Sequence, residues 1–136
     1  MKSTIIMLFF CFLGFSQNFE EIKKQALLDN KNIILVFSGS DWCAPCIKLD
    51  KTILQSDAFQ NECQKSWLFY KADFPKRAKI AEEIKKENAL LAEKYNAEGN
   101  FPLVVLLNPE GKILGKMGFK KIAPEEYIQE LHAFEK

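Results

Sequence analysis

The sequence lacks the charge excess, the repeats and the length that would indicate several large classes of proteins. Its 136 residues include 19 Lys or Arg and 18 Asp or Glu, a formal net charge of +1. A nucleic-acid-binding protein normally has a marked basic excess, so this balance argues against one. Repeats, low-complexity tracts and linkers are missing, and the length suits one domain. The apolar share of 48% is sufficient for one packed core and too high for a disordered chain.

Long apolar runs are also scarce, and the one at the N-terminus is too short to span a membrane. Met1 and Lys2 precede an uncharged, mostly apolar stretch over residues 5–15 (IIMLFFCFLGF). A membrane-spanning helix needs ~20 apolar residues. A basic start followed by an apolar stretch of this length is instead typical of a secretory signal peptide.

A cleavage site fits directly after that stretch, because Gly14 and Ser16 are small residues at the −3 and −1 positions of a cut after Ser16. We therefore expect residues 1–16 to be a cleaved secretory signal and residues 17–136 to be the mature domain. The mature protein would be secreted or periplasmic, with no stable insertion in a membrane. Two alternatives stay open: an uncleaved N-terminal anchor, and a lipid attached at Cys11.

Cysteine and histidine are rare as well. The four cysteines are too few for a disulfide scaffold, and Cys43, Cys46 and Cys63 would remain after cleavage. Export places such thiols in an oxidising compartment, where a disulfide can persist. Structural zinc requires four ligands, and beyond the first two cysteines only Cys63 and His132 remain, neither spaced as a second pair. We expect no metal and no cofactor; zinc, copper(I) on two thiolates and a purely structural disulfide stay open as alternatives.

Alternating helical and strand patterns predict an α/β fold with one sheet. Short apolar runs predict strands at 33–37, 67–72 and 103–107, and turn residues predict a hairpin that returns over 112–118. Apolar spacing predicts helices from Phe19 to Leu27, after Trp42 to about Asp57, from Lys76 to Tyr95, and from Pro124 onwards. We therefore expect a central mixed parallel and antiparallel sheet flanked by helices on both faces.

The most informative motif is Trp42–Cys43–Ala44–Pro45–Cys46, at the expected junction of a strand and a helix. Residues three apart on a helix have Cβ atoms ~5–6 Å apart, so a disulfide can form and break there with little backbone movement. The helix N-terminus favours a thiolate, most strongly at Cys43, and Pro45 suits the first helical turn. The spacing predicts Cys43 as an accessible nucleophile and Cys46 as a shielded resolving cysteine.

With this motif the chain resembles the thioredoxin family, and within it the secreted bacterial thioredoxin-like branch. The resemblance covers about residues 19–134. It rests on the strand at 33–37, on 40–46 (SDWCAPC), on 100–102 (NFP) before the third strand, and on Gly118 at the end of the hairpin. It implies a thioredoxin-like fold and the activity of a thiol–disulfide oxidoreductase.

The resemblance also implies binding residues and partners. A cis bond between Phe101 and Pro102 would face the cysteines and expose the Phe101 backbone to an extended substrate segment; a trans proline at a strand start is the alternative. Residues expected to contact substrate are Trp42, Ala44, Pro45, Phe101, Pro102 and Gly118, although Trp42 could be an ordinary core residue. Expected partners are protein dithiols or disulfides and an upstream thiol electron donor, and the protein itself is expected to be a monomer.

One position departs from the family pattern. Phe37 stands six residues before Cys43, where the family has a buried acid that accepts the proton of the inner cysteine. Deprotonation of Cys46 then needs another route, through water or through Lys71, which approximately matches a family lysine and is a candidate aid to proton transfer. Asp41 is nearer in sequence but is expected at the surface.

Three features lie outside the motif. The expected helix Lys76–Tyr95 is longer than the corresponding segment in small thioredoxins, and it is either an elaborated scaffold or a partner surface. Cys63 is interpreted as a small buried residue, with a third redox thiol or an intermolecular bridge as alternatives. His132 is expected to be solvated rather than a catalytic base.

Together these patterns predict a secreted enzyme that exchanges disulfides with exported proteins through a Cys-Ala-Pro-Cys dithiol. Pro45 before the second cysteine resembles reductant-type motifs, which favours reduction of substrate disulfides, although the potential and the electron donor set the direction. The competing class is a non-catalytic binding module on the same fold, such as a chaperone or a metal carrier.

Overall fold

The computed structural model describes residues 18–136, so the predicted signal segment lies outside the described residues and its cleavage stays a prediction. The elements in chain order are α1 (Phe19–Asp29), β1 (Asn32–Ser38), α2 (Ala44–Leu49), the π-helix η1 (Asp50–Leu54), α3 (Asp57–Ser66), β2 (Trp67–Asp73), α4 (Glu82–Tyr95), β3 (Leu103–Leu107), β4 (Ile113–Met117) and α5 (Pro124–Ala133). Within this part of the chain, no helix is long and apolar enough to cross a membrane.

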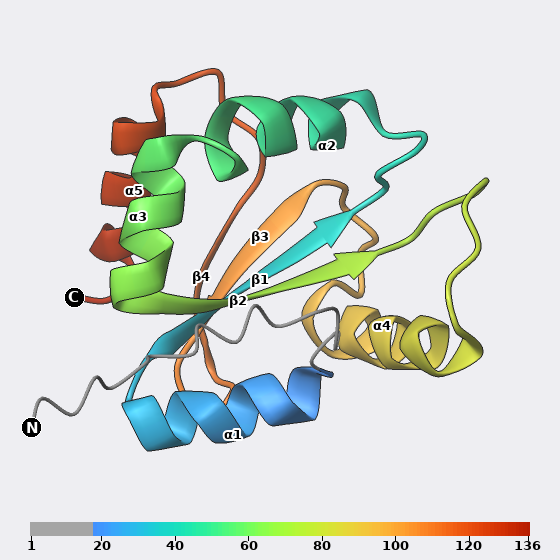
Figure 1. Ribbon diagram of the computed structural model, residues 1–136, viewed down its shortest axis with the longest axis horizontal. Coiled ribbons are helices and arrows are strands. Elements are labelled where there is room, and N and C mark those ends of the chain that lie inside the picture. Colours follow the sequence, from blue (N-terminus) through green and yellow to red (C-terminus); the bar gives the residue numbers. More distant parts are fainter. Residues whose placement is uncertain (1–17) are drawn as a thin grey trace, which may run out of the picture.

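The strands form one sheet in the order β2-β1-β3-β4 (Figure 1). β1 runs parallel to β2 and antiparallel to β3, and β3 pairs antiparallel with β4. The mixed sheet and the hairpin are therefore as predicted. Every residue of the apolar run Ile33–Phe37 is at most 1% exposed, because β1 has a hydrogen-bonded neighbour on each side and helices over each face.

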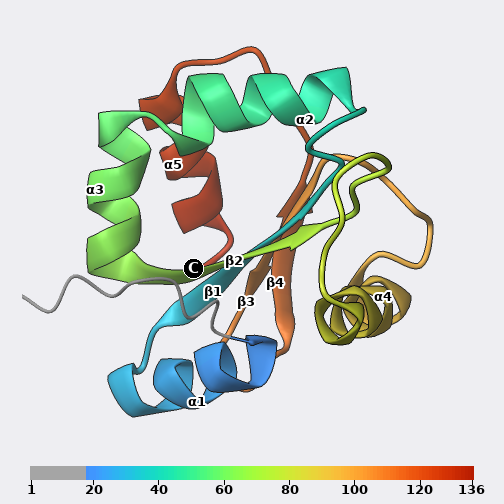
Figure 2. The same cartoon turned by 45° about the vertical axis from the view of Figure 1, so that its right-hand side comes forward.

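Two helical layers enclose the sheet (Figure 2). Successive strand residues point to opposite faces, so the β1 run divides its side chains between two cores. On one face, Leu35 and Phe37 pack with Phe19 of α1 and Leu91 of α4. On the other face, the alternate β1 residues pack with Leu49, Phe59 and Leu131, which belong to α2, α3 and α5. Residues 18–136 therefore have the expected α/β fold, a mixed sheet between two helical layers.

The expected helix after Trp42 is shorter than predicted, and a further helix follows it. α2 ends at Leu49 and continues as η1, which ends at Leu54, whereas the predicted helix ran to about Asp57. Ser56 is the N-cap of α3, since its side chain accepts the backbone N–H of Phe59 at 3.2 Å. The Ser56–Asp57 pair is an ordinary helix-start signal, but the ten residues of α3 include few apolar side chains, and only Phe59 among them is buried.

The predicted long helix is wrong at its N-terminal end. α4 begins at Glu82, and residues 74–81 form an irregular loop between β2 and α4. The backbone N–H groups of Lys76, Arg77 and Ala78 bind the carboxylate of Asp41, each at 2.8 Å. A contact with a residue so distant in sequence overrides the helical propensity of this Lys- and Ala-rich segment. We call residues 74–81 the basic loop.

Candidate redox site

The two motif cysteines form a disulfide at the start of α2, with their Cα atoms 5.2 Å apart, within the range that a disulfide spans. Cys43 is the N-cap of the helix, and its Sγ accepts the backbone N–H of Cys46 at 3.3 Å. The Sγ of Cys46 in turn accepts the backbone N–H of Gly39 at 3.4 Å. Donors in these positions stabilise a thiolate over a thiol once the bond is reduced, which is the electrostatic setting that the sequence predicted for Cys43.

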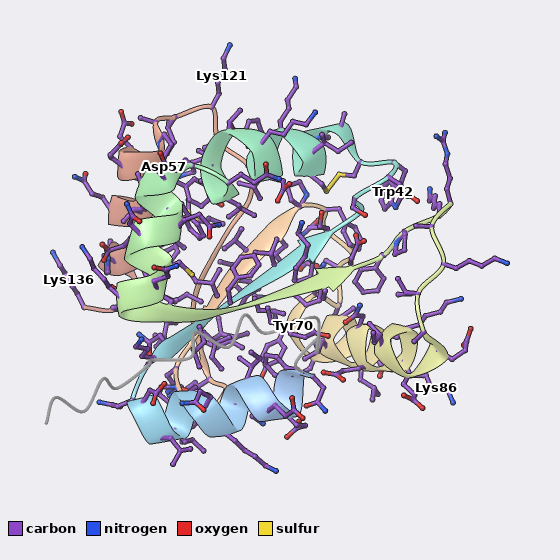
Figure 3. The ribbon with its side chains drawn as sticks, in the orientation of Figure 1. Trp42, Asp57, Tyr70, Lys86, Lys121 and Lys136 are labelled. Atoms are coloured by element: carbon purple, nitrogen blue, oxygen red, sulfur yellow. A yellow bond between two sulfur atoms is a disulfide. The ribbon has the colours of Figure 1, made fainter. Side chains whose placement is uncertain are left out.

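Both cysteines are buried in this disulfide-bonded state. Cys43 is 5% exposed and Cys46 is 2% exposed. Cys43 is thus slightly more exposed than Cys46, and the accessibility predicted for the Cys43 thiolate in the reduced enzyme stays a prediction. Ala44 and Pro45 are exposed beside them. Trp42 is 39% exposed, and in Figure 3 it lies next to the disulfide. These three residues form an exposed rim around a covered sulfur pair.

The segment before β3 lies next to this rim. The Phe101–Pro102 bond is cis, as the resemblance implied. The ring of Phe101 packs edge-on against Trp42, with centroids 5.6 Å apart. An added Cβ on Gly118 would lie 3.7 Å from the carbonyl oxygen of Pro102, so these two segments are neighbours. The structure therefore brings Trp42, Phe101, Pro102 and Gly118 to the same end of the sheet as the cysteines.

Trp42 is held in a fixed place, and a partner that the sequence analysis missed helps to hold it. The indole Nε1–H donates to the carbonyl oxygen of Phe74 at 2.7 Å, and the ammonium of Lys76 lies 4.2 Å from the centroid of the indole ring. An added Cβ on Gly39 would come within 2.3 Å of the indole. The residue at that position must therefore be glycine for Trp42 to lie where it does.

Two carboxylates connect the end of β2 and the basic loop to the segment before Cys43. Asp73 accepts both the backbone N–H of Ser40 at 2.9 Å and its hydroxyl at 2.5 Å. Asp41 is half-buried, and its carboxylate faces the loop backbone. The N–H groups of Lys76, then of Ala78, hold the pKa of the Asp41 carboxyl below its usual value. This contact could have been expected from the topology. Because β1 and β2 are parallel, they end at the same edge of the sheet, and Asp41 and the basic loop follow those two strand ends.

Phe37 and Lys71 do not share a face of the sheet. Phe37 is fully buried in the core under α1 and α4. Lys71 lies opposite Val36 on β2 and therefore points to the other face, where its ammonium is 3.2 Å from the carboxylate of Asp50. Asp50 follows Cys46 by one helical turn, and its backbone N–H bonds to the Cys46 carbonyl. The structure thus adds an acid near Lys71 that the sequence analysis did not select.

Cys63 and His132 lie on α3 and α5, away from the motif in sequence. Cys63 is a free, half-buried thiol that packs against the core, and burial raises its pKa to about 11. His132 is half-exposed but not merely solvated, so that prediction is wrong. Its ring nitrogens lie 2.8 Å from Glu62 and 2.6 Å from Glu135, and the ring packs against Trp67 at a tilt of 34°, with centroids 4.6 Å apart. Within residues 18–136, no group of three or more His, Cys, Asp or Glu is placed to hold a metal ion.

A disulfide that caps the helix after a central strand, together with a cis-proline segment beside it, defines a thiol–disulfide oxidoreductase of the thioredoxin fold. The comparison with family models agrees: the chain belongs to the thioredoxin-like domain family, whose model matches residues 19–135. The family predicted from the sequence is therefore confirmed, and so is the class of enzyme.

The chain is similar to several individual proteins of this class. Disulfide bond reductase DsbH of Chlamydia pneumoniae is 34% identical over 115 residues, which cover 85% of this chain and 69% of the relative. A solved structure of a DsbH oxidoreductase has a TM-score of 0.82 at 32% identity, covering 87% of this chain and 81% of the other. Thioredoxin-related protein DsbJ of Chlamydia pneumoniae is 29% identical over 86 residues, 63% of this chain and only 24% of that protein. A thioredoxin from Thermus thermophilus shares the fold at 15% identity, with a TM-score of 0.62.

Proposed function

We propose that this enzyme reduces disulfides of exported proteins, using Cys43 as the nucleophile and Cys46 as the resolving cysteine. The observation that carries the proposal is the Cys43–Cys46 disulfide at the N-terminus of α2, with a backbone N–H directed at each sulfur. Two further points support reduction as the direction: Pro45 precedes the second cysteine, and the chain is similar to a protein named a disulfide bond reductase.

The first step starts from the reduced enzyme. The thiolate of Cys43 attacks one sulfur of the substrate disulfide, a new S–S bond joins enzyme and substrate, and the substrate S–S bond breaks. The departing substrate sulfur leaves as a thiolate and takes a proton from water. The N–H of Cys46 and the helix N-terminus stabilise the attacking charge before the step.

The second step releases the substrate. The thiolate of Cys46 attacks the Sγ of Cys43, forming the intramolecular disulfide and expelling the second substrate sulfur as a thiolate. The substrate has then gained two electrons and the enzyme has lost two. A protein thiol donor upstream restores the dithiol by the same exchange in reverse. In this scheme the protein acts as a monomer.

Deprotonation of Cys46 needs a route that does not use position 37, which is a buried phenylalanine. We propose that the Lys71–Asp50 ion pair assists through water. Asp50 is one helical turn from Cys46 and its side chain is 28% exposed, so solvent reaches the pair. Lys71 keeps Asp50 in place and is the positioning residue of this pair.

In this proposal the substrate contacts the exposed rim and the cis-proline segment. Trp42, Ala44 and Pro45 surround the sulfur pair, and the backbone of Phe101 pairs with an extended segment of the substrate in the manner of an added strand. Pro102 and Gly118, which are neighbours, shape the floor next to that segment.

Export is proposed from the N-terminal sequence, with residues 1–16 removed and residues 17–136 forming the mature domain in a secreted or periplasmic location. Mass spectrometry of protein purified from the producing cells should find Gln17 at the N-terminus. A chain that still begins at Met1 would contradict cleavage, and a diacylglycerol mass at Cys11 would indicate a lipid anchor instead.

An insulin-reduction assay tests the central proposal. Wild-type protein should reduce insulin with a dithiol donor, Cys43→Ser should be inactive, and Cys46→Ser should accumulate mixed disulfides with substrate. Equal activity in all three proteins would contradict disulfide exchange and favour a binding module on the same fold. Equilibration with glutathione tests the direction, since a potential near the strong-oxidant end, ~−120 mV, would overturn reduction.

A further inference from the structure

The exchange chemistry makes no use of the basic loop, residues 74–81, although the loop lies beside the redox site. Lys76, Arg77 and Lys79 are all exposed, and the loop contains no acid. We propose that the basic loop is a docking surface for an acidic segment of the substrate protein, located next to the disulfide that Cys43 attacks. The inference rests on the proposed function, because it specifies which substrates that same site prefers.

The loop is at the correct end of the molecule for this role. Figures 1 and 2 place the segment between β2 and α4 at the same end of the sheet as the start of α2. Trp42 joins the two regions: its indole donates to Phe74 at 2.7 Å and lies under the ammonium of Lys76. A substrate chain that passes over the exposed Trp42 toward Cys43 therefore meets the cations of the loop.

The hydrogen bonds that anchor the loop to Asp41 use its backbone and none of its cationic side chains. Asp41 binds backbone N–H groups of residues 76–78, and Asp73 binds Ser40. A loop fixed through its backbone presents Arg77 and Lys79 at defined positions while leaving their charged groups in solvent. This also allows the charges to be removed by substitution while the anchoring hydrogen bonds remain.

The charge around the loop is mainly positive. A groove of about 570 Å³ runs along it, lined by four cations, Lys76, Arg77, Lys79 and Lys85, against two acids, Asp73 and Glu82. Asp73 is occupied with Ser40, and Asp41 directs its carboxylate into the loop backbone. The whole chain carries a formal net charge of only +1, so the excess of positive charge is a property of this groove and not of the whole protein.

An acidic segment fits such a surface by charge complementarity. Oppositely charged patches at a rim mainly raise the association rate and depend on salt. The preference should therefore appear in kcat/KM at low ionic strength and shrink when salt screens the charges over ~10 Å or less.

The test compares two disulfide-bonded peptides that differ only in three Glu or three Gln residues beside one cysteine. Wild-type enzyme should reduce the Glu peptide about three- to tenfold more efficiently in kcat/KM at low salt. The triple variant Lys76→Gln, Arg77→Gln, Lys79→Gln should lose this ratio, and 0.5 M salt, as a chosen condition, should reduce it in the wild type.

A matched control removes the same charge elsewhere. Lys24→Gln, Lys65→Gln and Lys136→Gln change exposed lysines on α1, on α3 and at the C-terminus, and Figure 3 shows Lys136 on the opposite side from Trp42. This variant should keep the Glu-to-Gln ratio. A ratio near one in the wild type, or a ratio that survives in the loop variant, would overturn the docking surface while leaving disulfide exchange intact.

A binding measurement separates this inference from the proposed function. Cysteine-free versions of the two peptides should differ in affinity for the oxidised enzyme, the Glu version binding more tightly, by titration calorimetry at low salt. If neither disulfide peptide is reduced but the Glu version still binds selectively, the exchange proposal fails and the docking surface stands. Equal affinity for both peptides would count against the docking surface.

Discussion

The redox end of the sheet and the α3–α5 side of the molecule hold cysteines in opposite environments. Near α2, each sulfur accepts a backbone N–H and the pair lies under an exposed rim. Near α5, Cys63 has apolar neighbours, and burial raises its pKa to about 11. All three cysteines are at least half-buried, so burial is common to the two environments. The environments differ in the backbone N–H groups directed at the motif sulfurs, and such donors favour a thiolate.

The largest expected effect is a difference in alkylation rate between these two environments. In reduced protein at pH 7, iodoacetamide should modify Cys43 at least ~100-fold faster than Cys63, because only the thiolate reacts and burial keeps Cys63 protonated. Raising the pH should accelerate Cys63 by about tenfold per unit up to about pH 11. Peptide mass spectrometry against time measures both rates.

Unfolding provides the control for this comparison. In denaturant the thiols should return to an ordinary pKa of ~8.5 and react at similar rates. Equal rates in the folded protein would mean that the environments do not differ as described.

Two glycines, one near the redox site and one near the end of α5, are each packed tightly against an aromatic ring. An added Cβ on Gly39 would come within 2.3 Å of Trp42, and one on Gly115 would come within 2.2 Å of Phe134. Gly39→Ala should displace Trp42 and lower the rate of disulfide reduction about tenfold, since misplacement near a reacting group is costly. Gly115→Ala should instead lower the free energy of unfolding by ~1–3 kcal/mol, with little change in rate.

Stopped-flow reduction kinetics and urea denaturation distinguish the two results. If Gly115→Ala slowed exchange as much as Gly39→Ala in fully folded protein, the separation between the redox end and the far side would be wrong.

A smaller effect is expected at the anchor of the basic loop. Asp41→Ala should lower the amide-exchange protection of residues 76–78 by about five- to tenfold, because each loses a charge-assisted hydrogen bond. Asp50→Asn, which removes a charge on the other face, should leave those amides unchanged.

Titration of the same amides gives the pH dependence. The pKa of Asp41 is lowered in the folded protein, so its contribution is fully present above the usual value of 3.8 and is lost as the pH falls through the lower folded value. The amide shifts of residues 76–78, measured by NMR, should therefore change with a midpoint below 3.8. A midpoint at or above that value would exclude the anchor.

The smallest effect is expected at His132. His132→Ala removes the packing against Trp67 and the contacts with Glu62 and Glu135, and it should lower the free energy of unfolding by ~1 kcal/mol. Exchange kinetics should not change. A loss of activity in folded protein would show that this side of the molecule communicates with the redox site.

Local patterns in the sequence predicted the parts of the structure that depend on neighbours in the chain. The apolar run Ile33–Phe37 predicted a buried strand, and the spacing of Cys43 and Cys46 at a helix start predicted a redox disulfide, with zinc and copper(I) as alternatives; the structure has the strand and the disulfide. The helix α3 was missed because it contains few apolar residues, although Ser56 carried a capping signal.

The parts that were missed depend on contacts between distant segments. Residues 76–81 of the basic loop were assigned to a helix because Asp41, which binds this segment, lies far earlier in the sequence. For the same reason the partners of Trp42 and the pairing of Lys71 with Asp50 became visible only when β1 and β2 were placed side by side.

The position of β1 in the middle of the sheet has a consequence for local opening of the native state. Sub-global fluctuations free the least protected segments first and the central ones last. The segment that ends at Ser38 is bonded on both edges, to β2 and to β3, and it leads directly into the dithiol. Fraying of the outer helices or opening of the loops should therefore leave β1 paired and the two cysteines in place. Native-state hydrogen exchange should find the β1 amides among the last to exchange.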